Sequence, residues 1–218
     1  MEYTIHPIAH IRTDFTDKFG IPRQSGLVPE LTARIVFEPE YRDPNALAGI
    51  EGYDRLWLIW QFSTVAAEYA AGKSWRPTVR PPRLGGNQSV GVFATRSTHR
   101  PNGIGQSVVK LDRVEPGRLW LSGIDLLDGT PVLDIKPYVP YADQVPEAFN
   151  RIADAPPVAV PVEWSDSALD QAQALQVGRE GAAQRIGLGI RDVLAHKAVG
   201  NTVGVLGECL VHEGDEGW

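Results

Sequence analysis

Three basic side chains, Arg96, His99 and Arg100, fall close together in the stretch GVFATRSTHRPNGIGQS (residues 91–107), which contains no acidic residue. Guanidinium groups form paired hydrogen bonds with phosphate and carboxylate oxygens. The two glycines that follow allow a sharp turn, or a close approach of the backbone to a ligand. The stretch therefore predicts a loop that binds an anionic or polar ligand.

This loop belongs to the most basic part of the chain. Residues 73–110 contain seven Lys or Arg and no Asp or Glu, although the whole chain has a net charge of −6. Arg76, Arg80 and Arg83 are interspersed with prolines, which cannot join a central strand, in WRPTVRPPRLGGN (residues 75–87). Such a rigid arginine loop suits contacts with phosphates, with a solvated basic face as the alternative interpretation. The negative net charge of the whole chain argues against a general nucleic-acid binder. Because the positive charge is concentrated in residues 73–110, we expect this segment to recognise the partner.

Two further clusters of polar residues do not fit the pattern of buried apolar residues expected for a protein core. The segment IPRQSG (residues 21–26) places Arg23 and Gln24 in a loop, and DLLDGTPVLDIKPY (residues 125–138) places Asp125 and Asp128 close together. Asp-Gly is first of all a turn signal, so an ordinary turn is one interpretation. The other is that a carboxylate at this turn accepts hydrogen bonds from a ribose or an amino group.

Other kinds of site are not indicated. The segment NGIGQSV (residues 102–108) lacks the third glycine of a dinucleotide-binding loop, and no G-x-S-x-G occurs. His6 and His10 are four positions apart in a strand-like segment, so we interpret them as ordinary histidines and expect no metal. The single cysteine, Cys209, excludes an internal disulfide and a cysteine-rich zinc site.

No apolar run is long enough to span a membrane, and the N-terminal sequence lacks the basic and apolar regions of a secretory signal. We therefore expect a cytoplasmic protein with no membrane segment.

Alternating and apolar runs predict strands, and few helices lie between them. The expected strands are 3–15, 32–40, 54–64 (buried on both faces), 89–96, 107–129 with a hairpin turn at 116–117, and 131–141; a short helix is expected at 44–52. Seven or so strands in this order favour a mainly β fold, a barrel or a sandwich. From 166 to 197 the spacing becomes helical. The sequence thus predicts one domain over 1–145 and a small C-terminal α/β appendage over 146–218.

Four of these blocks occur in one order: IPRQSGL, WRPTVRPPRLGGN, GVFATRSTHRPNGIGQS and DLLDGTPVLDIKPYVPYAD. Together, from about His6 to Asp143, they resemble the YaeB/TrmO family, also called the TsaA-like or VirR-like domain. The resemblance implies a single-sheeted β-barrel that binds S-adenosylmethionine. It also implies a homodimer that methylates N6 of N6-threonylcarbamoyladenosine, next to the anticodon of tRNA.

The resemblance also implies roles for particular residues. The expected cofactor contacts are Pro22, Arg23, Gln24, Ser63, Thr64, Arg96, Gln106, Asp125, Leu126, Leu127 and Asp128. The expected phosphate contacts in the basic segment are Arg76, Arg80, Arg83 and Arg100. Asp128 and His99 are the candidates for a catalytic base, with a water molecule, or loss of the proton after attack, as alternatives.

Two departures from the family pattern are visible. Gly103 stands where relatives usually have proline, and the C-terminal segment lacks the Asp-Pro-Arg-Pro-type sequence of many relatives. Two other functions therefore stay open at this point. One is a regulatory barrel that binds S-adenosylmethionine or RNA without catalysis, and the other is an enzyme that methylates a different acceptor.

Overall fold

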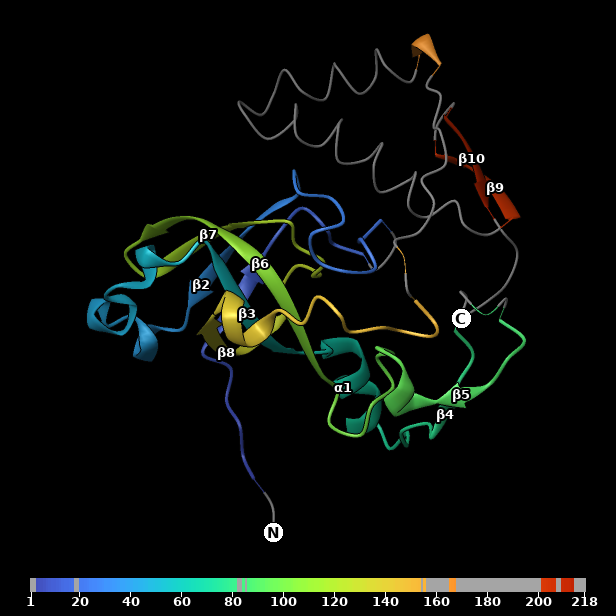
Figure 1. The fold of residues 1–218 in the computed structure, drawn as a ribbon, viewed down its shortest axis with the longest axis horizontal. Helices are drawn as coiled ribbons and strands as arrows, with labels where there is room; N and C mark the ends of the chain where they lie inside the picture. The colour runs from blue at the N-terminus through green and yellow to red at the C-terminus, as the bar shows by residue number, and fades with distance from the viewer. Residues whose placement is uncertain are drawn as a thin grey trace.

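Six antiparallel strands close into one barrel in a computed structural model of the protein, which describes residues 3–17, 20–81, 84, 86–153, 155, 165–167, 201–206 and 209–213. Around the barrel the strands are β1 (Ala9–Arg12), β2 (Thr32–Phe37), β7 (Arg118–Ser122), β6 (Ile104–Glu115), β3 (Arg55–Gln61) and β8 (Pro131–Pro137), which returns to β1 (Figure 1). Closure leaves no strand edge unpaired in the barrel. The expectation of a mainly β, single-sheeted barrel is confirmed.

Side chains at alternate positions along each strand point into the barrel and fill its interior. In β3, Leu56, Leu58 and Trp60 are buried, and the residues between them are only partly covered. The prediction that this run is buried on both faces was wrong, because its outward face is covered only in part. There the Trp57 indole donates a hydrogen bond to the Asp143 carboxylate (3.0 Å).

The pairing of β3 with β6 explains why position 105 is a glycine. Trp60 on β3 pairs with Gly105 on β6, and the indole lies directly over this glycine. A Cβ atom at position 105 would lie 2.5 Å from Cζ2 of Trp60, far inside van der Waals contact. The indole cannot move freely, because its Nε1–H donates a hydrogen bond to the Ser107 hydroxyl (3.1 Å).

Gly105→Ala should therefore lower the free energy of unfolding by about 1–3 kcal/mol, the usual cost of overpacking a filled core. Denaturant unfolding measures this, with Gly91→Ala as the matched control because a Cβ atom at position 91 meets nothing within 4 Å. Equal stability of the two variants would contradict the packing described.

The antiparallel register gathers three connections at one end of the barrel, which we call the long-loop end. Arg12 lies opposite Arg34, and Trp60 lies opposite both Gly105 and Val132. Residues 13–31, 62–103 and 123–130 therefore all leave the barrel from this end. The opposite end carries residues 38–54 and the predicted hairpin turn at 116–117, which is confirmed.

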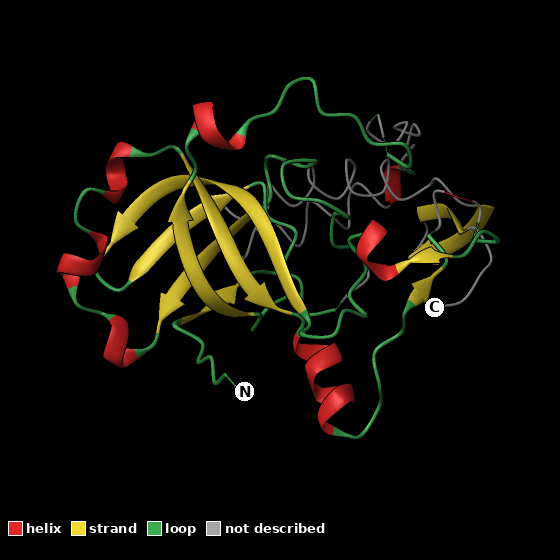
Figure 2. Ribbon diagram, turned by 60° about the horizontal axis from the view of Figure 1, so that its bottom comes forward, coloured by secondary structure: helices red, strands yellow, loops and turns green. Residues whose placement is uncertain are grey.

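The connection 62–103 contains α1 (Ser63–Ala70), β4 (Thr78–Val79), β5 (Val90–Gly91) and the 3-10 helix η5 (Val92–Ala94). Figure 2 shows α1 projecting from the barrel. The predicted strand 54–64 ends at Gln61, because Phe62 donates its N–H to the Gly103 carbonyl (2.8 Å) and the helix then begins. The predicted strand 89–96 is confirmed only at Val90–Gly91 (β5): beyond Gly91 the chain turns, and both the N–H and the hydroxyl of Thr95 donate to the Val92 carbonyl.

Short 3-10 helices follow β2 on the other side of the barrel from α1 (Figures 1 and 2). They are η1 (Pro39–Tyr41), η2 (Pro44–Leu47) and η3 (Ile50–Gly52). The predicted single helix over 44–52 is two 3-10 helices, because Gly49 adopts a left-handed conformation (φ 85°) between them. The first predicted strand is also shorter than expected, since only Ala9–Arg12 pairs with β2.

After β8 the chain forms α2 (Pro140–Asp143), and farther on β9 (Asn201–Leu206) pairs with β10 (Cys209–Glu213) in a two-stranded sheet. The predicted helical region 166–197 lies outside the described residues except for 166 and 167. The boundary near residue 145 stays a prediction. None of the helices among the described residues is both long and apolar enough to cross a membrane.

Candidate functional site

Three residues from three different connections meet at the long-loop end. The Arg96 guanidinium donates a hydrogen bond to the Gln24 side-chain oxygen, and its positive charge acts on the Asp125 carboxylate. The backbone around them is also linked, since Gly26 donates its N–H to the Gly123 carbonyl (2.8 Å). The structure thus brings together one predicted cofactor residue from each of the three polar clusters.

Asp125 is the residue of this cluster with the most unusual environment. Burial raises the pKa of its carboxyl from 3.8 to about 6, although several interactions oppose the rise. The opposing interactions are hydrogen bonds from the Ser107 hydroxyl and from the backbone at Ser25 and Asp125, together with the charge of Arg96. A carboxyl group that titrates close to neutral pH at the end of a barrel is typical of a functional site.

Ser107 and Trp60 connect this carboxylate to the barrel core. The Ser107 hydroxyl donates to Oδ1 of Asp125 (2.7 Å) and accepts from the Trp60 indole N–H (3.1 Å). Neither residue was among the sequence-predicted site residues. The signal that could have found Ser107 is the period-two pattern of β6, in which it occupies an inward position among Val109 and Leu111. A polar side chain at such a position needs a partner inside the barrel.

Asp128 lies in the same loop but faces the end of β1. Its carboxylate accepts the Thr13 N–H (3.1 Å) and lies 3.5 Å from the Arg12 guanidinium. Its own N–H donates to the Phe15 carbonyl (2.7 Å). These contacts fasten the 123–130 loop to the 13–31 connection, and the role of Asp128 as cofactor contact or base stays a prediction.

The remaining predicted cofactor residues border this cluster. Pro22 is buried and Arg23 is exposed, while Leu126 is only 2% exposed and anchors its loop in the core next to the partly buried Leu127. Ser63 and Thr64 form the first turn of α1 at the long-loop end. Gln106 is exposed on β6, on the face opposite to the buried Ser107.

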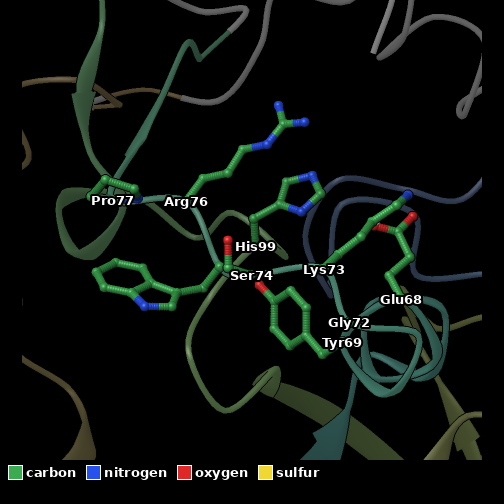
Figure 3. Close-up of a pocket in the computed structure, with 9 residues that line it drawn as sticks. Glu68, Tyr69, Gly72, Lys73, Ser74, Arg76, Pro77 and His99 are labelled. Atoms are coloured by element: carbon green, nitrogen blue, oxygen red, sulfur yellow. The ribbon is translucent and has the colours of Figure 1, made fainter.

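A second group of predicted residues lines a polar cavity of about 430 Å³ beside α1. Its lining comprises Glu68, Tyr69, Gly72, Lys73, Ser74, Trp75, Arg76, Pro77 and His99. Figure 3 shows Arg76 and His99 extending toward the same side from two separate segments. The structure therefore brings together one predicted phosphate contact and one predicted base.

The cavity also contains features that the sequence did not reveal. Glu68 on α1 lies 3.4 Å from the Lys73 ammonium, so the segment without acidic residues begins at a cation that has a carboxylate partner. The Tyr69 hydroxyl is buried and has no hydrogen-bond partner among the described residues. An unpaired buried donor at a cavity wall is suited to a polar ligand.

The other predicted phosphate contacts have different surroundings. Arg80 is exposed directly after β4, and Arg83 lies outside the described residues. Arg100 donates hydrogen bonds to the Thr95 carbonyl (2.7 Å) and, more weakly, to the Val92 carbonyl (3.4 Å), which holds its own loop in shape. Its contact with RNA stays a prediction.

His10 has a carboxylate partner rather than a second histidine: its Nδ1 lies 2.6 Å from Oε1 of Glu38. In the part of the chain that the structure describes, no three His, Cys, Asp or Glu side chains form a group that could hold a metal ion.

The comparisons with known proteins agree with this architecture. The profile of the tRNA-methyltransferase O N-terminal domain matches residues 10–144. The chain is 59% identical over 172 residues to the RcsF protein of Pseudomonas aeruginosa, assigned to the S-adenosylmethionine-dependent methyltransferases, covering 79% of this chain and 70% of that protein. It is 40% identical over 197 residues to the Escherichia coli tRNA (adenine(37)-N6)-methyltransferase, covering 88% and 80%. The crystal structure of TrmO from Pseudomonas aeruginosa superimposes with a TM-score of 0.73 at 46% identity, covering 90% and 82%. The chain therefore belongs to the tRNA-methyltransferase O family.

Proposed function

We propose that the protein methylates N6 of N6-threonylcarbamoyladenosine at position 37 of tRNA. As a member of its family it is an S-adenosylmethionine-dependent tRNA (adenine(37)-N6)-methyltransferase. The finer part of the proposal is the identity of the nucleoside, a threonylcarbamoylated adenosine rather than a plain one.

The cluster of Gln24, Arg96 and Asp125 fits S-adenosylmethionine. When bound, this cofactor supplies an activated methyl group on a sulfonium and also carries an amino group, a carboxylate and ribose hydroxyls. The Asp125 carboxylate suits the amino group or the hydroxyls, and the Arg96 guanidinium suits the carboxylate. Gln24 orients Arg96 through the hydrogen bond between them. The donors and acceptors present therefore match those of the cofactor.

The cavity beside α1 is the observation that favours the threonylcarbamoylated nucleoside. The threonylcarbamoyl group adds a carboxylate and a hydroxyl to adenine, whereas plain adenosine has no anionic group on its base. The cavity offers Arg76 and His99 together with the buried Tyr69 hydroxyl, while Lys73 in the same lining is paired with Glu68. Paired hydrogen bonds from a guanidinium are well suited to a carboxylate, so we assign Arg76 to this group.

The acceptor nitrogen must lose its proton when it is methylated, and two side chains are candidates for receiving it. His99 lines the cavity that we assign to the modified base, and it follows Arg96 by three positions on one loop. Asp128 is held by Arg12 and Thr13 at the end of β1. We place His99 first because of its position in the cavity, with Asp128 as the second candidate.

The test uses two tRNA preparations. The purified protein and S-adenosylmethionine are incubated with tRNA from cells lacking this gene, or with tRNA from cells unable to make the threonylcarbamoyl group. Mass spectrometry of the digested nucleosides should show one added methyl on threonylcarbamoyladenosine and none on plain adenosine 37. Equal methylation of both would remove the finer proposal, and cofactor binding without any methyl transfer would support a non-catalytic barrel.

Arg76→Ala should raise the KM for threonylcarbamoylated tRNA by about 10- to 100-fold, the loss expected for one charged hydrogen-bonded contact. Arg118→Ala is the matched control, because Arg118 is also exposed but begins β7 at the opposite end of the barrel. An Arg76→Ala enzyme with unchanged KM would exclude Arg76 from the substrate site.

The proposal includes two further expectations of the family resemblance, namely a homodimer and a location in the cytoplasm, where tRNA is found.

A further inference from the structure

Two aromatic rings stack on each other at the surface, outside the barrel core. The centroids of the Trp75 and Phe93 rings lie 6.1 Å apart with an interplanar angle of 30°. Trp75 is 41% exposed and Phe93 is 70% exposed, and their contact is made outside the cluster that fills the barrel. The packing of the barrel core therefore does not require aromatic residues at positions 75 and 93.

The backbone holds the two ring-bearing segments in place. Trp75 precedes β4 and Phe93 follows β5, and these strands pair at Thr78–Gly91 and Val79–Val90. Val92, next to Phe93, is 1% exposed and donates its N–H to the Pro77 carbonyl (2.9 Å). The pair is thus positioned before any partner arrives, which lowers the entropy lost on binding.

One arginine contacts the Phe93 ring, and two more lie close to Trp75 in the sequence. The Arg100 guanidinium carbon lies 5.7 Å from the centre of the Phe93 ring, a cation–π distance, and the exposed Arg76 and Arg80 lie in the same segment as Trp75. Each ring also lines a different cavity. Trp75 borders the cavity of about 430 Å³, and Phe93 borders one of about 200 Å³ with Arg100, Pro101, Asn102 and Ile104.

We infer that Trp75 and Phe93 form a stacking platform for an unpaired base of the tRNA anticodon loop, a neighbour of the base that is methylated. Exposed aromatic rings next to arginines bind single-stranded RNA, because every base has a π-face and every linkage a phosphate. The absence of Asp and Glu between residues 73 and 110 favours such a polyanion over a peptide. This inference rests on the proposed function, since it requires tRNA as the partner.

The experiment compares two RNA probes. One is a hairpin with the anticodon-loop sequence and 2-aminopurine in place of a loop adenine, and the other is a fully paired duplex of equal length. Trp75→Ala and Phe93→Ala should each weaken hairpin binding by about 5- to 150-fold, as stacking energies imply. Duplex binding should change little, because paired bases cannot stack on the platform. Wild-type protein should quench the 2-aminopurine fluorescence, and both alanine variants should lose this quenching.

Two controls sharpen the test. Phe149→Ala removes a phenylalanine that is 85% exposed but lies outside the basic segment 73–110, and it should leave hairpin affinity unchanged. Trp75→Phe keeps a ring and should retain most of the affinity. The slope of affinity against salt should stay as in the wild type for Trp75→Ala and flatten for Arg80→Ala, because only arginine neutralises a phosphate.

The outcomes separate this inference from the proposed function. If the wild type methylates threonylcarbamoylated tRNA while both alanine variants bind and quench the hairpin like wild type, the platform is wrong and the enzyme stands. Equal losses on hairpin and duplex would also overturn the platform, since they would indicate a general disturbance of the basic segment. If the hairpin results hold and no methyl transfer occurs, the platform stands and the proposed function fails.

Discussion

Asp125→Asn should give a protein that is more stable at neutral pH and yet binds S-adenosylmethionine about 10- to 100-fold more weakly. The binding loss is that of a charged hydrogen-bond acceptor replaced by a neutral one. The gain in stability has a separate cause. Burial disfavours the ionised carboxyl of Asp125, so its pKa rises from 3.8 to about 6 in the folded protein.

The sign of the stability effect follows from proton counts. Between about pH 4 and 6 the folded protein retains a proton on Asp125 that the unfolded chain has already released. The free energy of unfolding therefore falls as the pH rises through this interval, by up to about 3 kcal/mol for a shift of this size. Asparagine does not ionise, so the variant should lack this fall and exceed the wild type in stability at pH 7.

Denaturant unfolding at several pH values and isothermal titration with the cofactor measure both effects. Asp112→Asn is the matched control, because the exposed Asp112 carboxylate also accepts a serine hydroxyl, that of Ser122 (3.1 Å), but lies outside the long-loop cluster. It should change neither cofactor affinity nor the stability profile between pH 4 and 6. An Asp125→Asn protein that is less stable than wild type at pH 7 would contradict the assigned environment of the carboxyl group.

Ser107→Ala should have two effects that a simple packing defect would not combine. The Trp60 indole N–H would lose its acceptor inside the barrel, which costs about 1–3 kcal/mol of unfolding free energy. The Asp125 carboxyl would lose a hydrogen bond that lowers its pKa, so the pKa should rise above 6. If the ionised carboxylate binds the cofactor, as proposed, the acid midpoint of cofactor binding should then lie at a higher pH than in the wild type.

Ser122→Ala separates these two effects. Ser122 is also buried in the barrel, at 8% exposed, but its hydroxyl donates to Asp112. Its loss should reduce stability and leave the pH midpoint of cofactor binding in place. If the Ser107→Ala and Ser122→Ala proteins show the same midpoint, Ser107 does not position the Asp125 carboxylate.

Strands whose inward and outward residues differ in polarity could be predicted from the sequence. The hairpin of β6 and β7 and the start of β8 follow from alternation and turn residues, as does the β-rich class. The run 89–96 could not be predicted, because its apolar residues resemble a strand while Val92 is buried by a turn. Nor could α1, whose Ser63 start depends on Phe62 being held by the Gly103 carbonyl.

The contacts within the candidate site could not be predicted from the sequence. Resemblance to a family placed Gln24, Arg96 and Asp125 among the cofactor contacts, and the structure shows that they meet. The Asp125 carboxylate is held by the Ser107 hydroxyl, which in turn accepts the Trp60 indole N–H, and Ser107 and Trp60 touch only because β3 and β6 pair in one register. Such a contact has no local signal, since it arises from the order of strands around the barrel.

The position of β8 between β1 and β3 has a consequence for biosynthesis. β8 is the last barrel strand to leave the ribosome, and both of its neighbours are made long before it. A nascent chain that ends before Pro131 has two open strand edges, one on β1 and one on β3, and such edges favour pairing with other chains. The loop that carries Asp125 is emitted immediately before β8, so it is tethered at both ends only when this strand inserts. Closing the barrel and completing the cluster of Gln24, Arg96 and Asp125 are therefore one late event in synthesis, and a chain truncated before this event would expose unpaired strand edges and lack the candidate cofactor site.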